Sequence, residues 1–317
     1  MTRSTRPASS DFQITLLREG ITESTHLATV VVCDDRSRTL AQAGNAAMST
    51  FIRSSLKPFQ ALAVTSTGTL ERYGLGDPDL AIICSSHQGA IAQTRQVFNV
   101  LWRSDVDPTA LQCPIPAGKT SPLEHNCSGK HAGMLAVCQQ RLFPLENYLH
   151  RTHPLQKLIV GQLGELLKIP ADELIRAKDD CGAPTYAMTL SQMASLYAQL
   201  SSGQNLELER IVRAMTHCPQ FVGGNGHFDT ELMRLTEGEL VSKAGAEGIQ
   251  CVGRVGQGLG LAIKVHDGAK RAKYAVALHV LRQLGWLNPA IAEPLIEQFM
   301  LLSEVKRLEV TGELTML

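Results

Sequence analysis

The sequence predicts an α+β fold, organised as one domain over residues 1–317, and three observations carry this prediction. Strand-like segments occur near the start, at about 12–35, and again at about 238–268. Between them, from about 43 to 237, the patterns are almost only helical, and helical patterns return at about 269–301. Strands at both ends that frame a helical region are most economically joined in one antiparallel sheet, with helices on its faces and a helical lobe beside it.

The terminal segments carry the strand signals. "QITLLREG" and "HLATVVVCDD" are β-branched runs separated by a polar turn, which is the pattern of an antiparallel hairpin. Near the other end, "ELVSKAGAEGIQCVGRV" and "GLGLAIKVHDG" predict two or three more short strands interrupted by glycine. The final helices are expected at "AKRAKYAVALHVLRQLG" and "NPAIAEPLIEQFMLL".

The central region carries helix start signals. "GDPDLAII" and "THPLQKLIVGQLGELL" place proline at a first helical position, where its missing N–H costs nothing. "TLSQMASLYAQL" begins with hydroxyl residues that serve as caps, and "DTELMRL" opens with aspartate. We find no internal repeat, low-complexity segment or Pro/Ser-rich linker that would divide the chain.

The composition excludes several classes of partner. Thirty lysine and arginine residues balance thirty aspartate and glutamate residues, so there is no basic stripe for nucleic acid or for an anionic membrane. The polar N-terminus lacks the pattern of a secretory signal, and no apolar run reaches the roughly 18 residues of a membrane-spanning helix. We therefore expect a cytoplasmic protein with a small-molecule partner.

The eight cysteines of such a protein are expected to be reduced thiols. Most should behave as small buried apolar side chains, and this prediction covers Cys33, Cys84, Cys138, Cys218 and Cys251. Cys127 and Cys181 lie in more unusual surroundings.

Two serine-containing segments are candidates for nucleophilic chemistry. In "RSSLKPFQAL", Ser54 and Lys57 are three residues apart, so at a helix start both would share one face, and a desolvated lysine could act as base for the hydroxyl. A helix-capping serine followed by a solvated lysine explains the same spacing. In "ICSSHQG", Ser86 and His87 end an apolar helical segment, which is typical of cleft walls and of ordinary helix ends alike.

The stretch "HNCSGKHAGML" combines Cys127, Lys130 and His131 with two glycines four residues apart. The glycine spacing would let another backbone approach this helix closely. Cys127 and Lys130 would face the same way, and a thiol beside an ammonium at a helix start has a lowered pKa, as a nucleophile or metal ligand requires. A packed helix start with a surface lysine is the alternative.

Two further segments leave their roles open. "KDDCGAPTY" places Asp179 and Cys181 in a rigid turn, and two unusual cysteines 54 positions apart do not form a zinc signature by spacing. In "GLGLAIKVHDG", alternation puts Lys264 on one face of a strand, facing either solvent or a cleft. The loop "VGGNGHFDT" lacks the Lys-Ser/Thr ending of a phosphate loop, so nucleotide binding is not expected there.

Taken in order, "RSSLKPFQ", "SSHQG", "HNCSGKHAGML", "DDCGAPTY", "VGGNGHFDT" and "GLAIKVHDG" resemble the rhizobial-type, or class 3, L-asparaginases. The resemblance extends from about residue 12 to about 285. It implies a fold similar to glutaminases and serine β-lactamases, conversion of L-asparagine to L-aspartate and ammonia, and a homodimer.

The resemblance also implies roles for individual residues. Two serine–lysine pairs would fall on Ser54 with Lys57 and on Ser86 with Lys264. A zinc ion that tunes activity would be held by Cys127, Lys130 and Cys181, with the lysine neutral. His87, His131, Asp179 and Cys181 would lie against the substrate. The expected reaction is acyl transfer, in which a lysine-activated serine attacks the amide carbon and water releases the acid.

The sequence departs from the family pattern at two positions. Ala90 stands where an acidic residue is common, and His227 stands where an arginine could clamp a substrate carboxylate. These departures bear on substrate affinity and selectivity. The alternatives that remain are a glutaminase, another small-amide hydrolase, and a non-catalytic zinc or thiol sensor.

Overall fold

The computed structural model describes residues 10–317. The predicted α+β fold is confirmed. The strands are Phe12–Arg18 (β1), Ile21–Asp34 (β2), Thr39–Ala43 (β3), Ser49–Phe51 (β4), Ile175–Lys178 (β5), Pro184–Thr189 (β6), Leu240–Ala244 (β7), Ile249–Arg254 (β8), Leu259–Val265 (β9), Leu301–Ser303 (β10), Lys306–Thr311 (β11) and Thr315–Met316 (β12).

Helices fill most of the central region and follow the last long strand. They are Lys57–Ser66 (α1), Thr69–Tyr73 (α2), Asp77–Ile83 (α3), Ile91–Arg103 (α4), Ser128–Arg141 (α5), Pro154–Leu167 (α6), Leu190–Leu200 (α7), Leu206–His217 (α8), Pro219–Val222 (α9), Phe228–Leu235 (α10), Lys270–Gln283 (α11) and Pro289–Met300 (α12). Short 3-10 helices lie at Arg53–Leu56 (η1), Pro108–Ala110 (η2), Pro122–Glu124 (η3) and Ala171–Glu173 (η4). None of the helices within residues 10–317 is long and apolar enough to cross a membrane.

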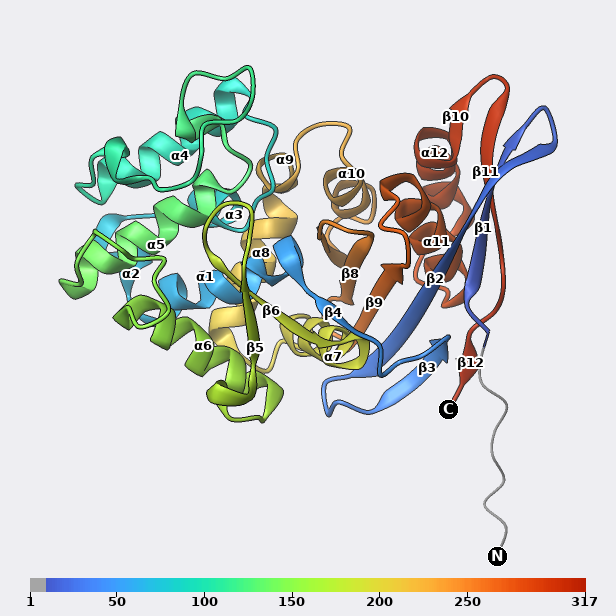
Figure 1. The fold of residues 1–317 in the computed structure, drawn as a ribbon, viewed down its shortest axis with the longest axis horizontal. Helices are drawn as coiled ribbons and strands as arrows, with labels where there is room; N and C mark the ends of the chain where they lie inside the picture. Colours follow the sequence, from blue (N-terminus) through green and yellow to red (C-terminus); the bar gives the residue numbers. More distant parts are fainter. Residues whose placement is uncertain (1–9) are drawn as a thin grey trace, which may run out of the picture.

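The main sheet joins both ends of the chain, as the terminal strand patterns predict. Its order is β10-β11-β1-β2-β9-β8-β7, and β3 pairs with β2 and with β12. The hairpin of β1 and β2 is antiparallel, and β2 is also antiparallel to β9, with Val30 opposite Ile263. Figure 1 shows this sheet beside the helical lobe formed by the middle of the chain.

Besides β3, which follows the first predicted hairpin, two parts of the sequence form strands that the patterns did not indicate. The segment after α12 supplies β10, β11 and β12, which extend the sheet beside β1 and β3. Inside the helical region, β4, β6 and β5 form a second, smaller antiparallel sheet. These strands have six residues or fewer, too few for a clear alternation of buried and exposed side chains.

Alternating side chains of the central strands supply two apolar cores. Val30 and Ile263 belong to the core under α11 and α12, whereas Val31 and Ala262 belong to the core shared with α7 and the helical lobe. This is the period of two that a strand covered on both faces imposes. The sheet therefore fixes the helical lobe on one side, and the edge strand β7 lies against η1 at the start of α1.

The glycine pair of α5 brings two functional segments together. A Cβ atom at Gly129 would lie 2.0 Å from the carbonyl oxygen of Ile82, and one at Gly133 would lie 2.7 Å from the side chain of Ile83. Only glycine permits this approach, as the four-residue spacing predicts. It places the start of α5 directly against the end of α3, immediately before Ser86.

Candidate active site

A cavity of about 300 Å³ opens where the end of β7, the start of η1, the end of α3 and the start of α11 meet. Of the predicted site residues, Ser54, Ser86 and His87 line it. The wall also contains Asn126, His227, Asp229, Ala246, Glu247, Lys270 and Lys273. The cavity is thus polar and rich in hydroxyl, amine and carboxylate groups.

Ser86 lies between two lysine amines. Its Oγ is 3.0 Å from Nζ of Lys57 and 2.8 Å from Nζ of Lys243. Its backbone N–H donates to the carbonyl of Val222 at 2.8 Å, which anchors the turn after α3. Both lysine side chains are completely buried. A hydroxyl between two desolvated amines is well placed to transfer protons.

The amine of Lys57 has three hydrogen-bond partners, two backbone carbonyls and the hydroxyl of Ser86. Its Nζ donates to the carbonyl of Ser85 at 2.5 Å and to that of Asn126 at 3.1 Å. Burial is the main cause that lowers the pKa of Lys57. In its neutral form the amine would have two N–H groups and one lone pair, so the two carbonyls would take both hydrogens and the lone pair would face the hydroxyl of Ser86.

Lys243 has the environment of a donor. Its Nζ lies 2.9 Å from the carbonyl of Ala244 and 4.0 Å from a carboxylate oxygen of Asp229. Burial lowers the pKa of Lys243 to about 7 although Asp229 opposes the shift. Burial also opposes ionisation of Asp229, but Lys243, Ser242, Ala244 and Gln250 together hold the pKa of this carboxyl below its usual value.

Ser54 is a second hydroxyl in the same cavity, but no hydrogen bond joins it to Lys57. The preceding residue, Arg53, has a left-handed backbone with φ of 53°, a strained conformation for a residue with a side chain. Arg53 is held by Asp179, which accepts from Nε at 2.9 Å. Within the described chain, the backbone N–H groups of Ser54 and Ala246 have no hydrogen-bond acceptor.

Lys264 does not make the expected contact with Ser86. Its Nζ donates to the carbonyl of Glu247 at 2.5 Å, and it is absent from the cavity wall. The reason is strand order, because Lys264 is on β9 and β8 separates β9 from the edge strand β7 that carries Lys243. The pairing of Ser86 with Lys264 is therefore corrected to a pairing of Ser86 with Lys243.

The L-asparaginase II family model matches residues 14–316, nearly the whole described chain. The chain belongs to the L-asparaginase II family. A comparison with curated proteins gives no match.

Solved structures that resemble this asparaginase-family chain have low identity. Two structures of Mglu are 15% and 16% identical to it, both with a TM-score of 0.48 and both over 82% of this chain. The chain spans 66% and 58% of the two Mglu chains, less than two thirds of their length. A β-lactamase from Mycobacterium bovis is 13% identical with a TM-score of 0.44, over 86% of this chain and 95% of its own.

A buried cluster of two thiols and an amine lies beside Lys57 of this asparaginase-family chain. Nζ of Lys130 is 3.1 Å from Sγ of Cys181, and the thiols of Cys127 and Cys181 are hydrogen-bonded. Burial favours a low pKa for Lys130, but the two cysteines outweigh it and raise the pKa. The hydrogen bond from Cys181 lowers the pKa of Cys127.

This donor set fits zinc in its chemistry. Two sulfur atoms and one nitrogen are ligands that zinc prefers, and three protein ligands leave a fourth position for water or substrate. No group of three or more His, Cys, Asp or Glu side chains suited to a metal occurs within residues 10–317. A metal at this position would therefore need the amine of Lys130 as its third ligand.

The two predicted histidines are both neutral and differ in their contacts. His87 accepts from the N–H of Gly89 through Nδ1 and donates to Ser128 through Nε2 at 2.8 Å, and burial lowers its pKa to about 3. Nδ1 of His131 is 2.6 Å from the hydroxyl of Tyr148, while its buried Nε2 has no partner within residues 10–317. His131 is fully buried and lines neither the catalytic cavity nor any other cavity described for residues 10–317, so its predicted contact with substrate is not seen.

Lys243 and Asp229 are the site residues that the sequence analysis missed. A signal for Lys243 was present, because "ELVSKAG" places a lysine inside an otherwise buried strand, where an unpaired charge is expensive. Asp229 was noted only as a helix start. Its carboxylate is buried and bonded to Ser242, Ala244 and Gln250 around β7.

Proposed function

We propose that this asparaginase-family chain hydrolyses the side-chain amide of L-asparagine, giving L-aspartate and ammonia by serine–lysine acyl transfer. The observation that carries the proposal is the hydroxyl of Ser86 between the buried amines of Lys57 and Lys243. Such an arrangement needs a lysine with a lowered pKa, and burial lowers the pKa of both.

Ser54 is the proposed nucleophile. Its hydroxyl has no hydrogen-bond partner within residues 10–317, whereas that of Ser86 is bonded to two amines and is better suited to carry protons. The strained backbone of Arg53 before it is typical of functional positions. The unpaired N–H groups of Ser54 and Ala246 supply two donors for the oxyanion that forms on the amide oxygen.

The proton route uses the bonds of Ser86 to Lys57 and Lys243, and its first transfer, from Ser54 to Ser86, crosses the cavity that both serines line. The proton of Ser54 passes through the hydroxyl of Ser86 to the lone pair of Lys57 as the new O–C bond forms. Collapse of the tetrahedral intermediate breaks the C–N bond, and the leaving nitrogen takes a proton from Lys243 through Ser86. Water then attacks the ester carbon and gives a proton through Ser86 to the neutral Lys243. The C–O bond to Ser54 breaks, Ser54 takes back the proton held by Lys57, and aspartate leaves with the serine and both lysines restored.

The cavity complements a small zwitterion. Lys270 provides a positive charge for the α-carboxylate, and Glu247 provides a negative charge for the α-ammonium. His227 contributes no permanent charge, because burial lowers its pKa. The roughly 300 Å³ of the cavity suits an amino-acid amide better than a peptide.

Zinc is proposed at Cys127, Lys130 and Cys181. When bound, the ion supplies a Lewis acid that polarises or orients a substrate oxygen. The serine and lysines provide the nucleophile and the proton transfers without it. We therefore propose that the thiol cluster tunes substrate binding.

The test is release of ammonia by the purified protein from L-asparagine and L-glutamine, with rapid acid quenching and mass spectrometry of the peptides. Release from asparagine and an acyl adduct on the Ser54 peptide support the proposal. Ser54→Ala and Ser86→Ala should each lower turnover by at least about a thousandfold, the usual scale for catalytic groups.

Each part of the proposal has its own contrary result. An adduct on the Ser86 peptide would exchange the two serine roles. Faster ammonia release from L-glutamine than from L-asparagine would show that glutamine is the preferred substrate. Full activity in both serine variants would remove the serine mechanism.

A further inference from the structure

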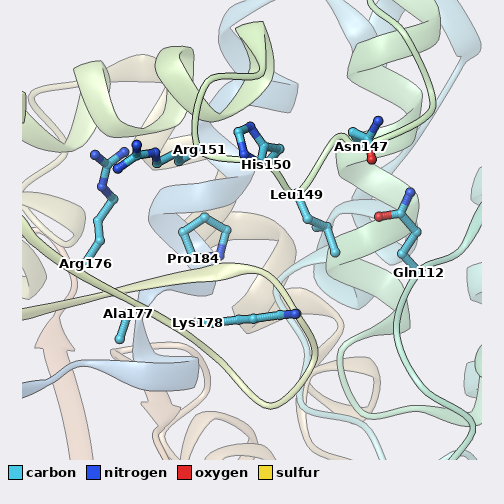
Figure 2. A pocket seen from close by; sticks show the side chains of 10 residues that line it. Gln112, Asn147, Leu149, His150, Arg151, Arg176, Ala177, Lys178 and Pro184 are labelled. Atoms are coloured by element: carbon cyan, nitrogen blue, oxygen red, sulfur yellow. The ribbon is translucent and has the colours of Figure 1, made fainter.

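A second cavity, of about 570 Å³, lies between the loop after α5 and the hairpin of β5 and β6. It shares no lining residue with the catalytic cavity. Figure 2 shows its wall, where Arg151 and His150 come from the loop, and Arg176 and Lys178 come from β5. The amide substrate of the serine centre is therefore not its natural occupant.

The charge of this second cavity is one-sided. Three permanent cations, Arg151, Arg176 and Lys178, line it, and no carboxylate does. Figure 2 shows the guanidinium groups of Arg151 and Arg176 directed toward one another. Like charges in a shared concavity repel unless a counter-charge lies between them.

Among residues 10–317, no side chain pairs with these three cations. No hydrogen bond or ion pair joins the side chain of Arg151, Arg176 or Lys178 to another group in the described part of the chain. Some arginines elsewhere are paired, as Arg234 is with Glu231 at 2.7 Å, and others, such as Arg36 and Arg141, are exposed single side chains. What distinguishes Arg151, Arg176 and Lys178 is that all three line one cavity.

The secondary structure fixes two of the cations on one wall. Arg176 pairs with Tyr186 and Lys178 with Pro184 in the hairpin, so the two basic residues are two positions apart and share a face. Leu149 and Pro184 add an apolar surface, and Gln112 and Asn147 add neutral amides. The cavity thus offers charged, polar and apolar contacts together.

We propose that this cavity binds a small organic polyanion with two or more phosphate or carboxylate groups. Arginine forks bind both kinds of group through paired N–H donors. Leu149 and Pro184 contact the organic part, and Arg151 and Arg176 bind one anionic group from both sides.

The experiment is calorimetric titration of the full-length protein with pyrophosphate and, separately, citrate, at about pH 8 and low salt. The test variant is Arg151→Gln/Arg176→Gln. The control variant is Arg36→Gln/Arg141→Gln, which removes two exposed arginines that lie outside the cavity and have no side-chain partner in the described part of the chain. Circular dichroism and melting midpoints check that both variants fold.

We expect saturable binding of at least one probe to the wild type, weakened at least about tenfold in the test variant and unchanged in the control. Binding of pyrophosphate alone would identify a phosphate ligand, and binding of citrate alone would identify a polycarboxylate. An equal loss of affinity in both variants would mean that the probe is attracted by the overall charge of the protein, and this result would overturn the site. The site would also be overturned if neither probe gave heat of binding with the wild type at probe concentrations up to about 100 micromolar.

Discussion

Two neighbouring regions bury lysine amines and shift their pKa values in opposite directions. Beside Ser86, burial lowers the pKa of Lys57 and brings that of Lys243 to about 7. In the thiol cluster, the pKa of Lys130 is raised because Cys127 and Cys181 outweigh an equally complete burial. Burial alone therefore does not determine the protonation of a lysine. In the metal-free cluster the two thiols favour the ammonium form of Lys130, so zinc binding there would release its proton.

The largest expected effect separates the catalytic lysines from a lysine outside the cavity. Lys57→Met and Lys243→Met should each lower ammonia release by about a thousandfold or more, because each removes an amine bonded to Ser86. Lys264→Met is the matched control, since its amine contacts only a backbone carbonyl. A loss of the same size in Lys264→Met would restore the pairing that the sequence suggested.

The next effect tests the contact that joins the two regions. Gly129→Ala should destabilise the protein by about 1–3 kcal/mol, because the new Cβ would lie 2.0 Å from the carbonyl oxygen of Ile82. Gly161→Ala is the control on α6, because a Cβ atom there has nothing within 4 Å. This substitution should stabilise the helix by about 0.5–1 kcal/mol. Urea unfolding measures both. Equal stability of the two variants would contradict the close packing of α5 on α3.

A smaller effect is expected in the thiol cluster. Cys127→Ser should abolish zinc binding while ammonia release falls only about tenfold, because the serine and lysines supply the chemistry. Cys138→Ser, on the same helix but outside the cluster, is the control and should keep the metal. Elemental analysis of dialysed protein gives the zinc content. Zinc retained by Cys127→Ser would place the metal elsewhere.

The smallest effect concerns pH. Lys243 must be charged to protonate the leaving nitrogen, so kcat/KM should fall as pH rises through about 7, the pKa to which burial lowers it. Asp229→Asn removes the carboxylate that favours the ammonium form, so the alkaline fall should move to lower pH. Rate profiles of the wild type and the variant give the comparison. A rate that rises with pH through about 7, with the rise moved to lower pH in Asp229→Asn, would show instead that the neutral amine of Lys243 is the active form.

Local patterns were enough to predict much of this fold. The terminal hairpin, the proline-started helices α3 and α6 and the glycine contact of α5 each depend on neighbours in sequence. The segments "SSHQG" and "RSSLKPFQ" also indicated two serines that reach one cavity.

What local patterns could not supply was the partner of Ser86. Alternation gives the face of a strand residue but not the order of strands in the sheet. Lys243 and Lys264 both lie in strands near the end of the chain, and only the order β9-β8-β7 decides between them. The anionic network of Asp229 depends on the same long-range arrangement, because its partners come from β7 and β8.

The sheet that holds β1 and β2 beside β9 has a consequence for how the chain is made. Strand β2 emerges early during synthesis, but its partner Leu259–Val265 emerges only after the whole helical lobe (Figure 1). Until then the apolar run "TVVVC" has an open strand edge, which is a site for association with other chains. Slow folding follows from such distant pairing, and chaperones that cover strand edges should raise the yield of folded protein.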